Sequence, residues 1–122
     1  MTVLKSYRDL EVWKKSIDWV EKIYLASKNF PSEEKFGLTS QIRRAAVSVP
    51  ANIAEGAARS GTGEYLQFLS VAKGSLAETE TLLILADRLH FLTEAEATHL
   101  LDLAEEISRM LGGLKRSLQS RR

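Results

Sequence analysis

Side chains able to carry out acid–base, nucleophilic or metal chemistry are few in this sequence. It contains no cysteine and two histidines, His90 and His99, which lie near one predicted turn. Glu96 and His99 have the Glu-x-x-His spacing of di-iron helical bundles, but such sites need two of these pairs and two further glutamates. Serines are spread along the chain without a neighbouring base and a group to orient it. We therefore expect no catalytic residue, no metal site and no cofactor.

Three glutamates are the remaining candidates for acid–base chemistry. Glu55, Glu78 and Glu80 would lie together if the two helices predicted to carry them face each other. More often such carboxylates bond to groups like Arg43 or Asn52 within a polar layer of a helical bundle. The sequence favours this structural role, and the protein is not expected to be an enzyme.

Basic residues are better functional candidates, because their clusters could hold phosphate groups. Arg43 and Arg44 are adjacent, so their side chains leave a helix about 100° apart. Arg59 lies beside a glycine-flanked threonine and a predicted helix start, which could bind one phosphate, although an ordinary capped turn is favoured. Two further groups lie near the chain ends: Lys5, Arg8, Lys14 and Lys15, and Lys115, Arg116, Arg121 and Arg122. The candidate nucleic-acid-binding residues are Arg43, Arg44, Arg59, Lys14 and Lys15.

Charge balance weighs against a strongly basic surface on a single chain. There are 17 lysines and arginines against 16 aspartates and glutamates, a formal net charge of +1, so any basic site must be local. Glu55 and Arg59 are spaced as an i,i+4 ion pair. For a single chain, an exposed and self-neutralised helix face is therefore the favoured interpretation.

Length and composition predict one helical domain. The 122 residues are expected to form a single domain over 1–122, with a fraying end at 117–122. The absence of cysteine, of a signal peptide and of a long apolar segment favours a cytoplasmic protein without a membrane span. Apolar residues recur every three or four positions, which predicts an all-α chain.

Four helices are expected, over about 9–28, 38–59, 64–90 and 95–118. Apolar residues at heptad spacing run along the third and fourth of them, and Thr93 with Glu96 fits a capping box at the start of the fourth. Long helices joined by short turns predict an antiparallel up-down-up-down four-helix bundle.

The first helix has two neighbouring apolar faces. The face expected to line the core carries Leu10, Trp13, Ile17, Val20 and Tyr24. The other face carries Val12, Trp19 and Ile23, which we predict to be an exposed oligomer interface. A core wide enough to take both faces is the alternative.

Pro50 lies inside the second predicted helix and is expected to kink it. Proline lacks an N–H and its ring crowds the preceding turn, at a cost of about 3 kcal/mol in an unrelieved helix. Ser48, by bonding back to the preceding turn, and Asn52 are candidates to satisfy the freed backbone groups.

Small residues beyond the proline allow another helix to approach closely. Gly56 and several alanines form this small face of the second helix. Gly74 and Ser75 in the third helix are the expected counterpart, because a glycine inside a helix costs about 1 kcal/mol and is best explained by close approach.

The order and spacing of these residues resemble a known family. The segments "LEVWKKSIDW", "QIRRAAVSVPANIAEGAAR" and "FLSVAKGSLAETET" are similar to the four-helix bundle family named for proteins encoded in the intervening sequences of bacterial 23S ribosomal RNA genes. The resemblance covers residues from about 10 to 92. The family's characteristic residues correspond here to Arg43, Arg44, Ser48, Pro50, Asn52, Glu55, Gly56, Gly74, Ser75 and Glu78.

The resemblance implies a homopentameric ring of four-helix bundles with a connection to RNA. The accessory protein of diversity-generating retroelements, which works with a reverse transcriptase and RNA, is similar in fold. A ring would repeat each arginine around one axis and concentrate positive charge from a nearly neutral chain. The expected function is a non-catalytic RNA-associated binding module whose partners are itself and RNA or a nucleic-acid-processing protein, with no small-molecule substrate. The alternative is a protein-interaction scaffold that binds no nucleic acid.

Overall fold

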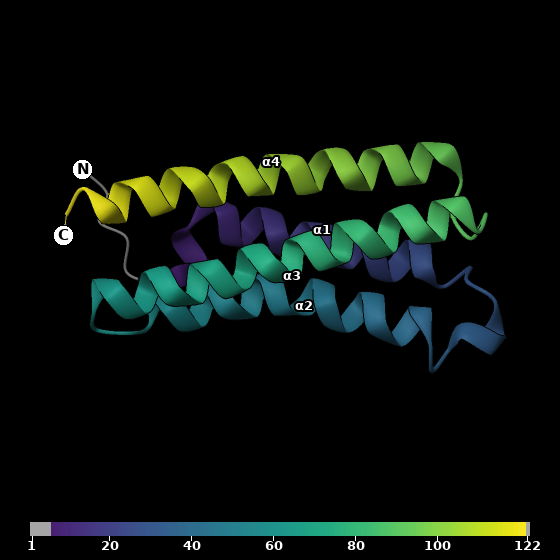
Figure 1. The fold of residues 1–122 in the computed structure, drawn as a ribbon, viewed down its shortest axis with the longest axis horizontal. Helices are drawn as coiled ribbons and strands as arrows, with labels where there is room; N and C mark the ends of the chain where they lie inside the picture. The colour runs from purple at the N-terminus through teal and green to yellow at the C-terminus, as the bar shows by residue number, and fades with distance from the viewer. Residues whose placement is uncertain (1–5, 122) are drawn as a thin grey trace.

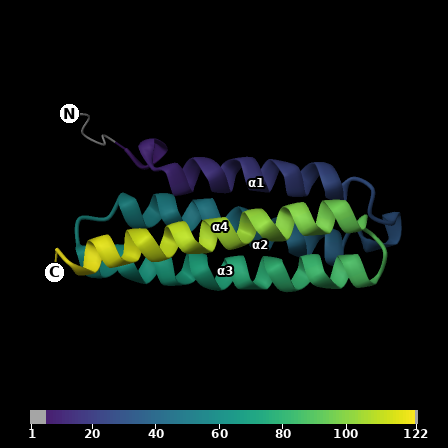
Figure 2. The ribbon, with the colours of Figure 1, turned by 90° about the horizontal axis from the view of Figure 1, so that it is seen from above.

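A computed structural model describes residues 6–121, which form four long helices and no strand. The helices are α1 (Glu11–Ser27), α2 (Leu38–Ala57), α3 (Thr62–Arg88) and α4 (Glu94–Gln119). They lie side by side along the long axis of the molecule (Figure 1, Figure 2). Two single-turn helices, η1 (Tyr7–Asp9) and η2 (Ser32–Glu34), precede α1 and α2. The prediction of an all-helical chain with four helices is confirmed, and every helix end lies close to its predicted position.

Short connections join the helices at the two ends of the molecule. The segments 28–37, before α2, and 89–93, before α4, lie at one end, whereas 58–61, before α3, lies at the other end beside the end of α4 (Figure 1). Thr93 and Glu96 form the predicted capping box, with Glu96 N donating to Thr93 Oγ1 at 3.1 Å and Thr93 N donating to Glu96 Oε1 at 2.9 Å. Residues 117–119, predicted to fray, are helical, and Leu118 is buried.

The core includes apolar stripes of α2, α3 and α4, and those of α3 and α4 follow the heptad spacing that the sequence predicts. The buried heptad positions of α3 are Leu69, Ala72, Leu76, Thr79, Leu83 and Ala86. Those of α4 are Ala97, Leu100, Ala104, Ile107, Leu111 and Leu118. Each large apolar side chain buried in this way contributes about 1.5–3 kcal/mol. Burial of these stripes, more than helix propensity, therefore holds the four helices together.

The structure corrects the predicted orientation of α1. Val12, Trp19 and Ile23 are 5%, 0% and 1% exposed and belong to the core, so the prediction that they form an exposed oligomer interface is wrong. Trp19 Nε1 donates to the backbone carbonyl of Leu100 in α4 at 3.1 Å, which satisfies the only polar atom of the buried indole. The other apolar face, represented by the half-buried Trp13, packs at the edge of this core.

Polar side chains bond to one another and to the backbone beside the buried Pro50. Helix continues on both sides of the proline. The Asn52 amide donates to the carbonyl of Ser48 at 2.8 Å and to its hydroxyl at 2.9 Å. The Ser48 hydroxyl also pairs with the hydroxyl of Ser75 in α3 at 2.8 Å. Asn52 thus bonds to the carbonyl of Ser48 and not to that of Ala46, which is the carbonyl freed by Pro50, and Ser48 links α2 to α3 instead of bonding back to the preceding turn.

Gly56, and not Gly74, is the glycine at the contact between α2 and α3. A Cβ atom added to Gly56 would lie 2.8 Å from Phe68 Cβ and 3.2 Å from the carbonyl oxygen of Tyr65, so a larger residue does not fit without movement. A Cβ added to Gly74 would meet nothing within 4 Å among the described atoms. The expectation that α2 approaches α3 closely at Gly74 is therefore wrong, although Ser75 does face α2.

Candidate functional site

The two predicted basic residues of α1 are paired with glutamates. Lys14 Nζ lies 3.4 Å from Glu11 Oε1 within the helix, and Lys15 Nζ lies 2.9 Å from Glu106 Oε1 of α4. Ion pairs with this much exposure contribute only about 0–1 kcal/mol to stability. Their main consequence is local charge compensation, which leaves little excess positive charge on this part of α1.

The positive charge of Arg59, which lies just after α2, is compensated by two glutamates. Its Nη2 lies 3.1 Å from Glu55 Oε1 and its Nη1 lies 3.9 Å from Glu64 Oε2. The guanidinium carbon lies 4.8 Å from the centre of the Phe68 ring. The predicted Glu55–Arg59 ion pair is therefore present, and its surroundings fit a self-neutralised helix face better than a phosphate site.

Arg43 is used to hold α2 against the last turn of α1. Its Nε donates to Ser27 Oγ at 2.8 Å and its Nη2 donates to the carbonyl of Tyr24 at 3.3 Å. The guanidinium also lies 4.7 Å from the centre of the Tyr24 ring. A cation at the C-terminal end of a helix is additionally stabilised by the helix dipole. The side chain of Arg43 thus joins α2 to α1, and its contacts within the chain account for its position.

Arg44 differs from the other four predicted residues. It is exposed, and its one hydrogen bond within residues 6–121 is a long contact of 3.5 Å from Nη2 to Ser40 Oγ. No carboxylate in that part of the chain forms an ion pair with it. Of these two adjacent residues of α2, Arg43 therefore bonds to α1 and Arg44 is open to solvent.

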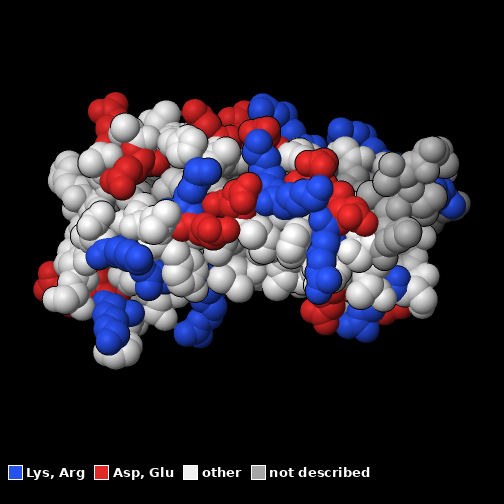
Figure 3. Space-filling view, turned by 180° about the vertical axis from the view of Figure 1, so that it is seen from behind, with Lys and Arg blue, Asp and Glu red and all other residues white. Residues whose placement is uncertain are grey.

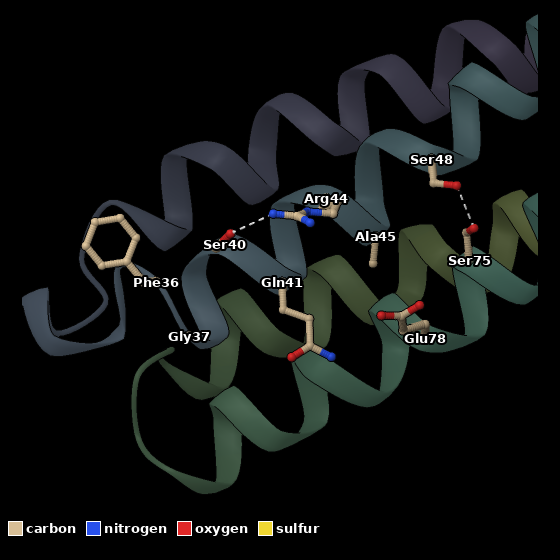
Figure 4. Close-up of a pocket in the computed structure, with 9 residues that line it drawn as sticks. All are labelled: Phe36, Gly37, Ser40, Gln41, Arg44, Ala45, Ser48, Ser75 and Glu78. Atoms are coloured by element: carbon tan, nitrogen blue, oxygen red, sulfur yellow. Dashed lines mark hydrogen bonds between the residues drawn. The ribbon is translucent and has the colours of Figure 1, made fainter.

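Arg44 lines a surface groove of about 420 Å³ between α2 and α3, which we name the Arg44 groove. Its lining residues are Phe36, Gly37, Ser40, Gln41, Arg44, Ala45, Ser48, Ser75 and Glu78. Figure 4 shows Phe36 at one end, Arg44 and Gln41 between, and the hydrogen-bonded Ser48 and Ser75 with Glu78 at the other end. The groove is thus elongated, and most of its lining side chains can form hydrogen bonds.

The Arg44 groove contains one positive and one negative side chain. Arg44 and Glu78 are its charged side chains, and neither joins an ion pair with a residue in 6–121. On the face of the molecule drawn in Figure 3, basic and acidic side chains are interspersed. An anion would therefore be attracted by individual side chains and not by a broad positive surface on one chain.

The three candidate glutamates do not come together. Glu55 pairs with Arg59, Glu78 lines the Arg44 groove, and Glu80 is half-buried on the side of α3 that faces α4. Burial, followed by the nearby charge of Glu105, raises the pKa of Glu80 above its ordinary value of 4.5. Glu55, Glu78 and Glu80 therefore do not form the acid pair that the sequence left open.

Metal ligands are also not gathered in the described part of the chain. Residues 6–121 contain no group of three or more histidines, cysteines, aspartates or glutamates that could hold a metal ion. Glu96 is engaged in the capping box, and His90, in the turn that follows α3, has a left-handed φ of 63°. Across the same residues, no helix has both the length and the apolar character needed to cross a membrane.

Sequence reasoning missed Phe36, Ser40 and Gln41 as neighbours of Arg44. The spacing of Gln41, Arg44 and Ser48 by three and four residues places them on one helix face, so this part of the groove was detectable. Phe36 precedes α2, and its position depends on the fold of a connection. Lys5 and Arg122, members of the two terminal basic groups, lie outside the described residues.

The comparisons with known proteins agree with the motifs in the sequence. The model of the family described as 23S rRNA-intervening sequence protein matches residues 8–113. The chain is also similar to the crystal structure of a protein with unknown function from the S23 ribosomal protein family of Bacteroides thetaiotaomicron VPI-5482, with a TM-score of 0.80 and 26% sequence identity over 86% of this chain and 95% of that chain. No curated protein matches the sequence. Since the family model spans most of the chain, the protein belongs to the family of 23S rRNA-intervening sequence proteins.

Proposed function

We propose that the protein is a non-catalytic RNA-binding module of the cytoplasm. In this proposal the antiparallel up-down-up-down bundle, kinked at Pro50, assembles into a homopentamer and contacts RNA through the Arg44 groove. The family name, which links these proteins to ribosomal RNA genes, supports RNA as the partner. The observation that carries the proposal is the exposed guanidinium of Arg44, which has no carboxylate partner within residues 6–121.

An uncompensated guanidinium is suited to binding phosphate. Arginine presents its N–H donors in a planar fork that matches two phosphate oxygens, and it remains charged at all physiological pH values. At Arg44 the donors are little used, because a contact of 3.5 Å to Ser40 Oγ is at the limit of hydrogen bonding. Nearby hydroxyl and amide groups could bind the sugar and base of the same nucleotide.

Assembly would strengthen this weak local field. A single chain carries a formal net charge of +1 and one uncompensated arginine in the groove. Repeating Arg44 around a ring axis would bring several such cations to one surface, which increases both the association rate and the number of phosphates bound.

The test is RNA binding by fluorescence anisotropy with a labelled unstructured RNA, between about 50 and 200 mM salt. We expect Arg44→Ala to weaken binding and to reduce the salt slope by about one for each phosphate that the variant no longer binds. Arg59→Ala is the matched control, since it removes the same side chain from a site where Glu55 and Glu64 already compensate it. Equal binding by wild type and Arg44→Ala would exclude the Arg44 groove as the RNA-binding surface.

Exposed apolar side chains favour a protein-interaction scaffold as the second candidate. Val71, Ile84, Leu85 and Leu89 of α3 and its end are each between 44% and 48% exposed. A protein docked on such side chains would bind with little dependence on salt, whereas RNA held by arginines would be released as the salt concentration rises. The salt titration therefore distinguishes the two candidates.

A further inference from the structure

Phe36 is displayed on the surface with no role in the core. It is 90% exposed, whereas Phe30, in the same connection between α1 and α2, is buried and packs 5.7 Å from Phe91. The ammonium of Lys35 lies 5.5 Å from the centre of the Phe36 ring, over one of its faces. With 90% of the residue exposed, the ring remains open to a flat partner.

Hydrogen bonds hold the backbone on both sides of Phe36, and Glu34 accepts those from the residues that follow it. The N–H of Gly37 donates to the carbonyl of Glu34 at 3.0 Å, and the N–H of Leu38 donates to the Glu34 carboxylate at 3.0 Å. Lys35 N also donates to the carbonyl of Ser32 at 3.1 Å. An exposed ring held on a pinned turn costs less entropy to order on binding than a ring on a free loop.

Phe36 begins a series of side chains that suits a nucleic-acid strand. Along the Arg44 groove the ring is followed by the guanidinium of Arg44 and the amide of Gln41, and then by the two serine hydroxyls and Glu78 (Figure 4). Single-stranded RNA is recognised by stacking of bases on aromatic rings, by cations at the phosphates and by polar groups at base edges. The basic residues lack interleaved aromatics along the sequence, but the fold places a ring and a cation in one groove.

Base pairing would prevent the use of these groups. In an A-form duplex the bases are stacked on one another and the major groove is too deep and narrow for side chains. A ring on the surface can stack only on a base that is unpaired or at an end. The Gln41 amide and the Glu78 carboxylate can likewise bond to the Watson–Crick edge of a base only where no complementary base occupies it.

We infer that the Arg44 groove binds a short unpaired segment of RNA, with one base stacked on Phe36 and a neighbouring phosphate on Arg44. This inference rests on the proposed RNA-binding function and specifies the form of RNA that the groove selects. Glu78 accepts a hydrogen bond from the amino group of a base, and it repels the phosphates from its end of the groove. The strand is thereby kept with its backbone toward Arg44.

The experiment compares a labelled unstructured RNA with the blunt duplex that it forms with its complement, using the full chain. Phe36→Ala should weaken single-strand binding about 5- to 160-fold, the range of one stacked base, while the salt slope and the weak duplex affinity stay unchanged. Phe36→Tyr keeps a ring and should bind as wild type does. Ile84→Ala, which shortens an apolar side chain on α3 that is 48% exposed and outside the groove, should have no effect.

The outcomes separate this inference from the function on which it rests. If Arg44→Ala weakens binding while Phe36→Ala does not, RNA binding stands and the stacking site is wrong. Equal affinity of the wild type for the single strand and the duplex would also overturn the stacking site. If the wild type binds neither RNA, both proposals fail. Because the Phe36 side chain is exposed, circular dichroism of each variant should match that of the wild type.

Discussion

Arg43 and Arg44 are neighbours in sequence with different roles. Arg43 bonds to Ser27 and to the carbonyl of Tyr24 at the end of α1, whereas Arg44 is open to solvent in its groove. The difference follows from helix geometry, because consecutive side chains point about 100° apart. A substitution of Arg43 should therefore lower the stability of the fold, and a substitution of Arg44 should weaken RNA binding.

Arg43→Ala should lower the free energy of unfolding by about 1–2 kcal/mol, since it removes hydrogen bonds from a charged donor and the packing on the Tyr24 ring. Arg44→Ala should change it by no more than about 0.5 kcal/mol, as is usual for an exposed residue. Urea unfolding followed by circular dichroism measures both values. Similar losses of stability in the two variants would contradict the separate roles.

Glu80 should make stability depend on pH. Burial and the charge of Glu105 raise its pKa in the folded chain above the ordinary 4.5. From pH 4.5 up to the raised value the folded state binds more protons than the unfolded state, so stability falls as the pH rises and the loss persists at higher pH. Glu80→Gln should gain up to about 0.5 kcal/mol near neutral pH and nothing below about pH 4. Urea unfolding at the two pH values tests this, and an equal gain at both would show that ionisation is not the cause.

At the scale of the helices, the sequence predicted the core stripes of α3 and α4 but not that of α1. Heptad spacing left one apolar stripe on α4, from Ala97 to Leu118, and the structure buries it. α1 has two such stripes side by side, and periodicity alone cannot rank them. Trp19 and Ile23 enter the core, whereas the amphipathic side chain of Trp13 is suited to the half-buried edge.

The candidate site was predictable only where its residues lie on one helix. Gln41, Arg44 and Ser48 follow from helical spacing, whereas the pairing of Lys15 with Glu106 and the position of Phe36 depend on how α1, α4 and the connection before α2 pack. Such contacts join residues that are distant in sequence. Local pattern therefore identified the basic residues and the Glu55–Arg59 ion pair, but it could not show the pairing of Lys15 with a glutamate of another helix.

Gly56→Ala should lower the free energy of unfolding by about 1–3 kcal/mol, because the added methyl group would overlap Phe68 and force α2 and α3 apart. Gly113→Ala is the control. It introduces the same change inside α4 at an exposed site where the nearest atom to the new Cβ, in Arg116, is 3.9 Å away, and it should gain up to about 1 kcal/mol from helix propensity. Urea unfolding gives both values, and a gain at Gly56 would show that the helices are not in close contact there.

At the scale of the whole molecule, burial of Val12, Trp19 and Ile23 removes the surface first expected to join subunits. A contact between copies must use another face. On α3, helical spacing places Val71, Gly74 and Leu85 on one side, and both apolar residues are substantially exposed. The space next to Gly74 is not filled by any other part of residues 6–121. It would allow a second copy to approach the helix backbone.

The proposed homopentamer should give a mass near five times the 13.6 kDa chain by light scattering at both low and physiological salt, because an apolar contact is little affected by screening. Gly74→Arg should reduce the mass without loss of helix, since the space around this position accommodates a side chain in the single chain. Thr98→Arg, on the exposed surface of α4, should retain the wild-type mass. A wild-type mass of 13.6 kDa at every concentration would exclude the pentamer. RNA binding would then depend on one Arg44 per particle, and its salt slope would be correspondingly shallow.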